Sequence, residues 1–142
     1  MAPARRPLLF IAALVLALTG IVAISQWRAA RSVELIPWRT DLASAEAEAG
    51  TQHKQVFAYF TATWCGPCQE MKRTTWSDND VRRAMEKRYI PVKIDIDEHA
   101  EVARNFGIEA VPTFIVLSDS GKEGRRQSGY QDQNEMLDWL AR

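Results

Sequence analysis

The chain has two cysteines, Cys65 and Cys68, and the motif Trp-Cys-Gly-Pro-Cys at residues 64–68 holds both of them. Two thiols at this spacing can carry out two-electron exchange, because one sulfur attacks a disulfide elsewhere and the other releases the product by closing a local ring. The same spacing makes half of a zinc site, but zinc needs a second pair of ligands. The two histidines, His53 and His99, stand at no ligand spacing, so the motif favours redox chemistry over metal binding.

The surroundings of the motif predict a strand that leads directly into a helix. Residues 55–61 are aromatic and β-branched, which is typical of a buried strand. Pro67 suits the first turn of a helix, where its missing N–H costs nothing. Gly50 and Gly107 are expected to end helices, and Asp97 is expected to cap one. The same signals predict helices over 41–49, 67–75, 81–88, 97–106 and 135–141, and further strands over 90–96, 113–117 and up to about 127.

This order of elements predicts an α/β fold. Strand–helix–strand units followed by a hairpin and a last helix give a mixed sheet with helices on both faces. Lys and Arg number 18 and Asp and Glu number 18, so the formal net charge is zero and no basic patch indicates nucleic-acid binding. Two cysteines cannot build a disulfide scaffold, so a hydrophobic core must hold the predicted domain, residues 38–142, together.

An uncharged, apolar run at residues 7–27 follows the short flank 1–6. As a helix it spans roughly 32 Å, which matches the hydrocarbon core of a bilayer, and it is longer than the apolar region of a cleaved signal peptide. Residues 23–26 form a poor cleavage site. We therefore predict an uncleaved transmembrane signal-anchor over 7–27, a linker over 28–37 and the α/β domain over 38–142, with cleavage as the alternative.

Arginines flank the apolar run on both sides. Arg5 and Arg6 precede it, and Arg28 and Arg31 follow it. Together with the N-terminal amine, the first pair tips the positive-inside rule toward a cytoplasmic N-terminus. The predicted topology is a single-pass protein of the cytoplasmic membrane whose α/β domain faces the periplasm or another extracytoplasmic space.

Trp64 and residues outside the motif add a wider pattern. Before the cysteines stand an aromatic residue, Phe60, and an Ala-x-Trp lead-in, Ala62 and Trp64. Further on come a Lys and an Asp near the next strand, two short segments and a separate glycine: Lys93, Asp97, Phe106-Gly107-Ile108, Ala110-Val111-Pro112-Thr113 and Gly129. With the motif, this pattern resembles the thioredoxin family over about residues 38–142, which implies a thioredoxin-like fold. The apolar run, together with residues 75–81, is similar to membrane-anchored envelope thioredoxins and to the C-terminal domain of DsbD-type disulfide reductases.

We predict separate roles for the two cysteines. Cys65, at the N-terminus of a helix, is the predicted nucleophile, because free N–H groups and the helix dipole there favour a thiolate. Cys68 lies one turn further in and would attack Cys65 within the mixed disulfide. Gly66 and Pro67 shape the tight loop between them, and Trp64 either docks partners or packs in the core. We expect no cofactor beyond the redox-active Cys65–Cys68 disulfide and no metal.

Four further residues bear on the site. The resemblance implies a cis peptide bond before Pro112, which would let the backbone of Val111 pair with an extended substrate peptide. Tyr59 stands where the family commonly has a buried Asp that helps to move the proton of the second cysteine, and a phenol with a pKa near 10 is a poor base. Water or another carboxylate must then take that proton. Lys93 either points toward the site and modulates it or is a solvated strand residue.

These inferences predict a membrane-tethered thiol:disulfide oxidoreductase that reduces or isomerises disulfides of extracytoplasmic proteins. The Gly-Pro pair between the cysteines resembles that of reducing thioredoxins. A reductase in an oxidising compartment needs electrons from elsewhere, so a membrane electron donor or thiol relay is an expected partner. Two alternatives remain open: an oxidant that donates disulfides, and a non-catalytic binding module or metallochaperone on the same fold.

Overall fold

The computed structural model describes residues 11, 13–22, 33–118 and 120–142. The chain divides into two compact units, residues 1–32 and 33–142, and each is described by itself. The second unit contains both cysteines and every strand among the described residues.

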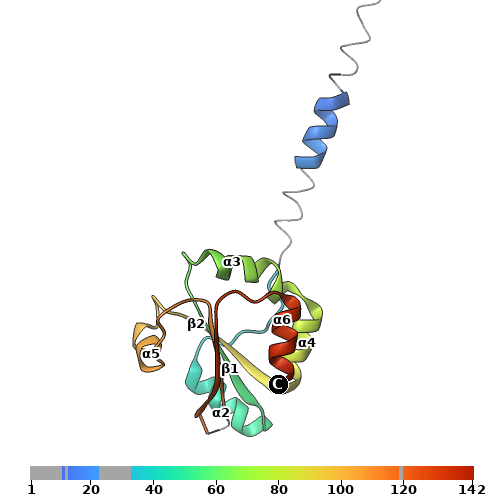
Figure 1. The fold of residues 1–142 in the computed structure, drawn as a ribbon. Helices are drawn as coiled ribbons and strands as arrows, with labels where there is room; N and C mark the ends of the chain where they lie inside the picture. Colours follow the sequence, from blue (N-terminus) through green and yellow to red (C-terminus); the bar gives the residue numbers. More distant parts are fainter. Residues whose placement is uncertain (1–10, 12, 23–32, 119) are drawn as a thin grey trace, which may run out of the picture. The chain divides into compact units, whose positions relative to one another are not determined.

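A four-stranded mixed sheet forms the centre of the second unit (Figure 1). Its strands are β1 (Gln55–Thr61), β2 (Tyr89–Asp95), β3 (Thr113–Leu117) and β4 (Glu123–Ser128), in the order β2-β1-β3-β4 across the sheet. β1 runs parallel to β2 and antiparallel to β3, and β3 runs antiparallel to β4. The predicted mixed sheet is therefore confirmed.

Helices cover both faces of this sheet, as predicted. They are α2 (Leu42–Gln52), α3 (Gly66–Arg73), α4 (Asn79–Arg88), α5 (Ala100–Asn105) and α6 (Gln133–Ala141), with a 3-10 turn, η1, at Thr75–Ser77. The face toward α3, α4 and α6 has a core rich in aromatic rings: Phe57, Tyr59, Trp76, Tyr89, Phe114 and Trp139. The face toward α2 and α5 has a mainly aliphatic core: Val56, Ala58, Ile90, Val92, Ile94, Ile115 and Leu117. We call these the aromatic face and the aliphatic face.

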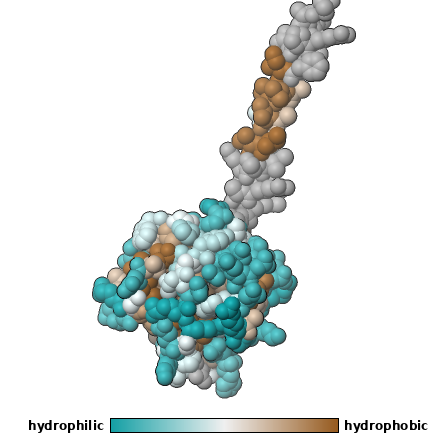
Figure 2. All heavy atoms as spheres, in the orientation of Figure 1, coloured by the Kyte–Doolittle hydropathy of each residue, from teal (hydrophilic) through white to brown (hydrophobic). Residues whose placement is uncertain are grey.

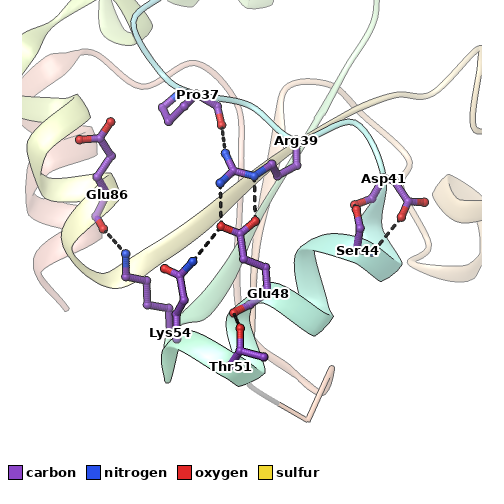
Figure 3. Close-up of polar contacts among 9 residues, drawn as sticks. Pro37, Arg39, Asp41, Ser44, Glu48, Thr51, Lys54 and Glu86 are labelled. Carbon is purple, nitrogen blue, oxygen red and sulfur yellow. Dashed lines mark hydrogen bonds and ion pairs between the residues drawn. The ribbon is translucent and has the colours of Figure 1, made fainter.

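Helix α2 ends later than the sequence predicts. It starts where expected, because the Asp41 side chain accepts the backbone N–H of Ser44 at 2.8 Å and caps the first turn (Figure 3). The prediction that Gly50 ends the helix is wrong, because helical structure continues to Gln52. His53 then takes the left-handed conformation at φ 53°, and its backbone N–H bonds a carbonyl of the last turn. A left-handed C-cap other than glycine therefore ends this helix.

The helix after β2 also begins later than predicted. The prediction that Asp97 caps it is wrong, because α5 begins at Ala100, after a turn in which the Asp95 side chain accepts the backbone N–H of Asp97 at 2.9 Å. Gly107, at φ 59°, lies just beyond the end of the helix, as predicted. The side chain of Asp97 is thereby left for a contact with another element.

Helix α6 begins before the predicted start at Glu135. The Asp132 side chain accepts the backbone N–H of Glu135 at 2.9 Å, and the Glu135 side chain accepts the backbone N–H of Asp132 at 2.9 Å. This reciprocal capping box satisfies two backbone donors at the helix start. It fixes the helix that places Met136 and Trp139 against the aromatic face.

Residues 33–39, ahead of α2, pack against the sheet. Ile36 is buried, and the backbone N–H of Leu35 donates to the carbonyl of Trp76 at 2.7 Å. The predicted linker over 28–37 therefore contains, from Glu34 onward, residues that contact the domain.

Arg39 holds this segment to two elements at once. Its backbone N–H donates to the carbonyl of Pro91 at 2.8 Å, and its carbonyl accepts the N–H of Lys93 at 2.9 Å, so it pairs with the outer edge of β2. Its guanidinium donates to both carboxylate oxygens of Glu48 in α2, at 2.7 and 2.9 Å (Figure 3). Backbone and side chain of one residue thus join the segment to β2 and to α2.

In the first unit, the described residues 13–22 form a helix. Large apolar side chains are exposed there: Ile11, Leu14, Val15, Leu16, Leu18, Ile21 and Val22. Figure 2 colours this segment mostly hydrophobic, whereas the visible face of the second unit is mostly hydrophilic. Among the described residues, no helix combines the length and the apolar character of a membrane span. The rest of the predicted anchor over 7–27 lies outside the described residues.

Candidate active site

The two cysteines form a disulfide where the chain passes from β1 into α3. Cys65 is the residue directly before the helix, and its Sγ accepts the backbone N–H of Cys68 at 3.2 Å. Gly66 and Pro67 form the first helical residues between them. Cys65 is only 3% exposed and Cys68 only 2%. The Cys65 sulfur therefore lies where helix N–H groups and the helix dipole stabilise negative charge.

Trp64 forms the exposed rim of the disulfide. Its side chain is 66% exposed, so the alternative that it packs in the core is wrong. Its indole N–H donates to the carboxylate of Asp97 at 2.8 Å, which fixes the ring from the loop after β2. On the other side of the motif, the Gln69 amide donates to the carbonyl of Thr63 at 3.3 Å. The rim thus presents an aromatic ring to solvent in a fixed orientation.

The Val111–Pro112 peptide bond is cis, as the resemblance implies. β3 starts at the next residue, Thr113, and its register sets Thr113 opposite Phe60 near the end of β1. The cis bond therefore lies at the same end of the central strands as the loop that carries the cysteines. Gly129 donates its backbone N–H to the carbonyl of Pro112 at 2.8 Å, and its φ of 98° is a conformation that favours glycine.

Tyr59 cannot replace the buried carboxylate that the family commonly has at its position. Its side chain is 1% exposed, and its hydroxyl has no hydrogen-bond partner in the part of the chain that the structure describes. Burial raises the pKa of this phenol, and the nearby side chains of Thr61 and Trp76 oppose the rise without making a hydrogen bond of normal geometry to it. Tyr59 therefore stays protonated at neutral pH and cannot take a proton from a thiol.

A cavity of about 140 Å³ lies beside Cys68. Lys93 lines it together with Tyr59, because the parallel register sets these two residues side by side on one face of the sheet. Lys93 therefore faces the site, and its role as a modulator stays a prediction. The other polar residues of the lining are Glu34, Thr61, Thr63, Gln69, Lys72 and Asp95.

Glu34 is a residue of this cavity that sequence reasoning missed. Its side chain is 14% exposed, and its two carboxylate oxygens lie 2.7 and 3.0 Å from Nζ of Lys93. The indole N–H of Trp38 donates to the same carboxylate at 2.6 Å. No local motif marks Glu34, because it reaches the site only through the packing of residues 33–39 against the sheet.

The arrangement is suited to thiol–disulfide chemistry. A disulfide takes up two electrons and two protons to become a dithiol, and the two sulfurs themselves carry the electrons. Within the described ranges, no three His, Cys, Asp or Glu side chains are grouped so as to hold a metal ion. His53 and His99 are both exposed.

Comparison with known proteins assigns the domain. Residues 42–142 match the thioredoxin-like domain family. The thioredoxin of Rickettsia felis is 32% identical over 85 residues, which cover 60% of this chain and 77% of that protein. Thioredoxin H2-1 of Oryza sativa is 38% identical over 85 residues, which cover 58% of this chain and only 56% of that protein.

Solved structures give the same assignment. A thioredoxin from Thermus thermophilus superposes with a TM-score of 0.67 at 28% identity, over 75% of this chain and 85% of that one. The oxidised C-terminal domain of Neisseria meningitidis DsbD superposes with a TM-score of 0.57 at 24% identity, over 73% and 97%, a likeness of fold. The chain therefore belongs to the thioredoxin-like family and is a thiol:disulfide oxidoreductase whose redox-active group is the Cys65–Cys68 disulfide.

Proposed function

We propose that this protein is a membrane-tethered oxidoreductase that reduces or isomerises disulfides of extracytoplasmic proteins. The observation that carries the proposal is the Cys65–Cys68 pair at the start of α3, with the exposed ring of Trp64 beside it. Because both sulfurs are buried, a partner must dock against this rim before exchange begins. Protein disulfides held in an extended segment suit such a site.

The exchange follows from the positions of the two sulfurs. In the reduced protein, the Cys65 thiolate attacks one sulfur of the substrate disulfide, and the other substrate sulfur leaves and takes up a proton. Cys68 then loses its proton and attacks Cys65, which breaks the bond to the substrate and frees its second thiol. The substrate gains two electrons and two protons, and the protein is left as the disulfide. If a substrate thiol attacks instead of Cys68, the substrate is isomerised and the dithiol is regenerated.

Substrate docking is assigned to Trp64, Val111 and Pro112. The Val111–Pro112 bond and the cysteine loop belong to the same end of the sheet. A peptide that pairs with the backbone of Val111 as an added strand would bring its own disulfide toward Cys65. The ring of Trp64 would supply apolar contact beside that peptide.

Residues 7–27 support the membrane tether. They carry no charge, and in their described part the large apolar side chains are exposed. A helix that is apolar on all sides requires an apolar environment, and the length of the run suits a bilayer. On this proposal the domain faces the periplasm, where the dithiol must be restored by a membrane electron donor or thiol relay.

Trapping of substrates tests the exchange. In the full-length protein, Cys68→Ser should accumulate mixed disulfides between Cys65 and its substrate proteins, because the resolving thiol is gone. Cys65→Ser is the matched control and should trap none. Alkylation in intact cells gives the direction, since a mainly reduced pair supports a reductase and a mainly oxidised pair supports a disulfide donor. No trapped protein, together with no reduction of insulin by the wild type, would contradict the proposal.

The topology has its own test. A thiol reagent that cannot cross membranes should label Cys65 in cells whose cytoplasmic membrane is intact and whose outer layers are permeabilised, after mild reduction. Protection of Cys65 until the cytoplasmic membrane is lysed would overturn the extracytoplasmic placement. Recovery of the full-length chain in the soluble fraction would overturn the tether.

A further inference from the structure

Cys68 needs a proton acceptor that the cysteine motif does not contain. Cys68 must become a thiolate before it can attack the mixed disulfide, and a thiol with an ordinary pKa of about 8.5 is mostly protonated at neutral pH. The side chain is only 2% exposed, so bulk water has little access to it. The acceptor must therefore lie on the cavity beside Cys68.

In the described part of the chain, the ionisable groups that line this cavity, besides Cys68 itself, are Glu34, Tyr59, Lys72, Lys93 and Asp95. Tyr59 is excluded because its buried phenol remains protonated. Lys72 and Lys93 are excluded because a lysine ammonium group donates hydrogen bonds and has no lone pair to accept a proton. Two carboxylates are left, and one oxygen of Asp95 already accepts the backbone N–H of Asp97 in the turn after β2.

Glu34 is placed differently from Asp95. Glu34 forms a close ion pair with Lys93, because the Nζ of Lys93 lies 2.7 and 3.0 Å from the two carboxylate oxygens. The indole N–H of Trp38 donates to the same carboxylate at 2.6 Å. Its side chain is 14% exposed and that of Lys93 is 31% exposed, so the pair is partly shielded from solvent. A carboxylate in this pair can take up a proton while the cation remains beside the cavity.

We propose that Glu34, held by Lys93, accepts the proton of Cys68 when the mixed disulfide is resolved. The O–H bond forms on Glu34 as the S–H bond of Cys68 breaks, and the positive charge of Lys93 then stabilises the new thiolate. The thiolate attacks Cys65, the bond to the substrate breaks, and the departing substrate thiolate takes up a proton released by Glu34. Two electrons pass to the substrate, and Glu34 returns to its ionised form.

The cavity offers a route for this proton. A volume of about 140 Å³ exceeds the roughly 30 Å³ that one water molecule occupies in the liquid, so several waters fit. Thr61, Thr63 and Gln69 supply further polar groups along the lining. A short water chain can therefore connect the Cys68 thiol to the carboxylate without direct contact.

Glu34 comes from outside the matched domain. The thioredoxin-like family match starts at residue 42, whereas Glu34 belongs to the segment 33–39 that packs on the sheet. Tyr59 occupies the position of the usual acid within the domain, and the segment ahead of the domain supplies a carboxylate to the same cavity. A fragment that starts at residue 42 would therefore lack this group.

The inference rests on the exchange role proposed above for Cys65 and Cys68. A two-phase reaction tests that exchange role and the role of Glu34 separately. Reduced full-length protein in detergent is mixed with the aromatic disulfide 5,5′-dithiobis(2-nitrobenzoic acid). Attack by Cys65 releases the first coloured thiolate, and attack by Cys68 on the resulting mixed disulfide releases the second. Stopped-flow absorbance is followed across a pH series. Loss of the first phase in the wild type contradicts the exchange role, whereas the second phase alone reports on Glu34.

Glu34→Gln should slow the second phase at least about tenfold at neutral pH, which is modest for the loss of a general base. The first phase should be unchanged, and the difference from wild type should shrink at alkaline pH, where hydroxide deprotonates the thiol. Glu34→Asp, which keeps a carboxylate, should restore most of the rate. Glu86→Gln is the matched control and should leave both phases unchanged, because it removes a carboxylate from another ion pair, with Arg82, away from the cavity lining.

Two results would overturn the proposal. One is a second phase in Glu34→Gln with the rate and pH profile of the wild type. The other is a slow second phase in Asp95→Asn with an unaffected Glu34→Gln, which would assign the proton to Asp95. Circular dichroism verifies folding of each variant, and Glu34→Ala replaces Glu34→Gln, with the same expectation, if the latter does not fold.

Discussion

The two faces of the central sheet are built from different side chains. On the aromatic face, the ring of Phe57 lies 5.6 to 6.1 Å, centroid to centroid, from four other rings, those of Trp76, Tyr89, Phe114 and Trp139. The aliphatic face is packed mainly by branched aliphatic residues and by small alanines from α2. The disulfide belongs to the aromatic side, and so does the ring of Tyr59 that lines the cavity.

This difference shows where the fold combines packing with chemistry. Large rings leave polar atoms inside the aromatic core, and among the described residues Tyr59 Oη and Trp76 Nε1 are buried without a hydrogen-bond partner. Such an atom costs about 1–3 kcal/mol when it is removed from water. Neither of these two atoms belongs to the aliphatic face, which serves as a scaffold. Mutations on the two faces should therefore differ in their effects on exchange more than in their effects on stability.

The largest effect should come from truncating one buried side chain on each face. Trp76→Ala and Ile115→Ala remove fully buried groups and should lower the free energy of unfolding by about 3–5 and 2–5 kcal/mol, respectively. Only Trp76→Ala should also slow disulfide exchange by the folded protein, because Trp76 contacts Tyr59 and Trp38 beside the cavity. Urea titration and insulin reduction measure the two quantities. Equal slowing by both variants would break the distinction between the faces.

Two tyrosines of the aromatic face should respond in opposite directions. Tyr59→Phe removes a hydroxyl that has no hydrogen-bond partner among the described residues, and it should raise the free energy of unfolding by about 1 kcal/mol. Tyr89→Phe should lower it by about 1–3 kcal/mol, because the Tyr89 hydroxyl donates to the carbonyl of Leu140 and accepts from Arg125. Denaturant unfolding of both variants is the measurement. Destabilisation by Tyr59→Phe would indicate a hydrogen bond to that hydroxyl.

The helix caps allow a smaller comparison between the faces. Asp132→Ala removes the capping box of α6, which packs on the aromatic face, and Asp41→Ala removes the single side-chain cap of α2 on the other face. Each should cost about 1 kcal/mol of stability, because each variant removes one side-chain acceptor of a backbone N–H. The loss should be larger for Asp132, because its bond is half of a reciprocal box and the remaining bond, from the backbone N–H of residue 132 to Glu135, is weakened with it. Thermal unfolding of the two variants tests this order, and a larger loss for Asp41→Ala would reverse it.

The smallest effect concerns the ion pair between Arg39 and Glu48. The hydrogen bond from Arg39 lowers the pKa of Glu48 from its ordinary 4.5. A carboxyl with a lowered pKa in the folded state adds stability above its ordinary pKa, and this contribution is lost as the pH falls through the lowered value. Glu48→Gln should therefore lower stability at neutral pH by less than about 1 kcal/mol, and hardly at all in strong acid. Melting curves at both pH values verify the sign.

The fold could be predicted from the sequence where local pattern and tertiary environment agree. The strand at 55–61 is apolar and β-branched because both of its faces are buried, and Gly107 lies at a helix end with the positive φ that favours glycine. Gly50 misled the prediction, because nothing in its local sequence shows that His53 takes over the C-cap three residues later. Asp97 misled it too, because its side chain bonds the distant Trp64 instead of the adjacent helix.

The site could be predicted only in its local parts. Cys65, Cys68 and Pro112 stand in short motifs whose spacing carries their chemistry. Glu34 belongs to no motif, and its place is set by a pairing with β2 that brings together residues 59 positions apart. Side chains that reach a site from another part of the fold leave no periodic or spaced signal in one sequence.

The pairing of Arg39 with β2 also covers part of one edge of the sheet. An open sheet edge presents N–H and C=O groups that can capture a strand of a second chain. At the outer edge of β2, Arg39 already occupies the carbonyl of Pro91, and proline has no N–H to offer. The opposite edge, β4, carries the charged side chains of Arg125 and Arg126 beside an irregular register. Both edges of the sheet are therefore ill suited to pairing with a strand of a second copy. Contact with other chains is left to the surface around the disulfide.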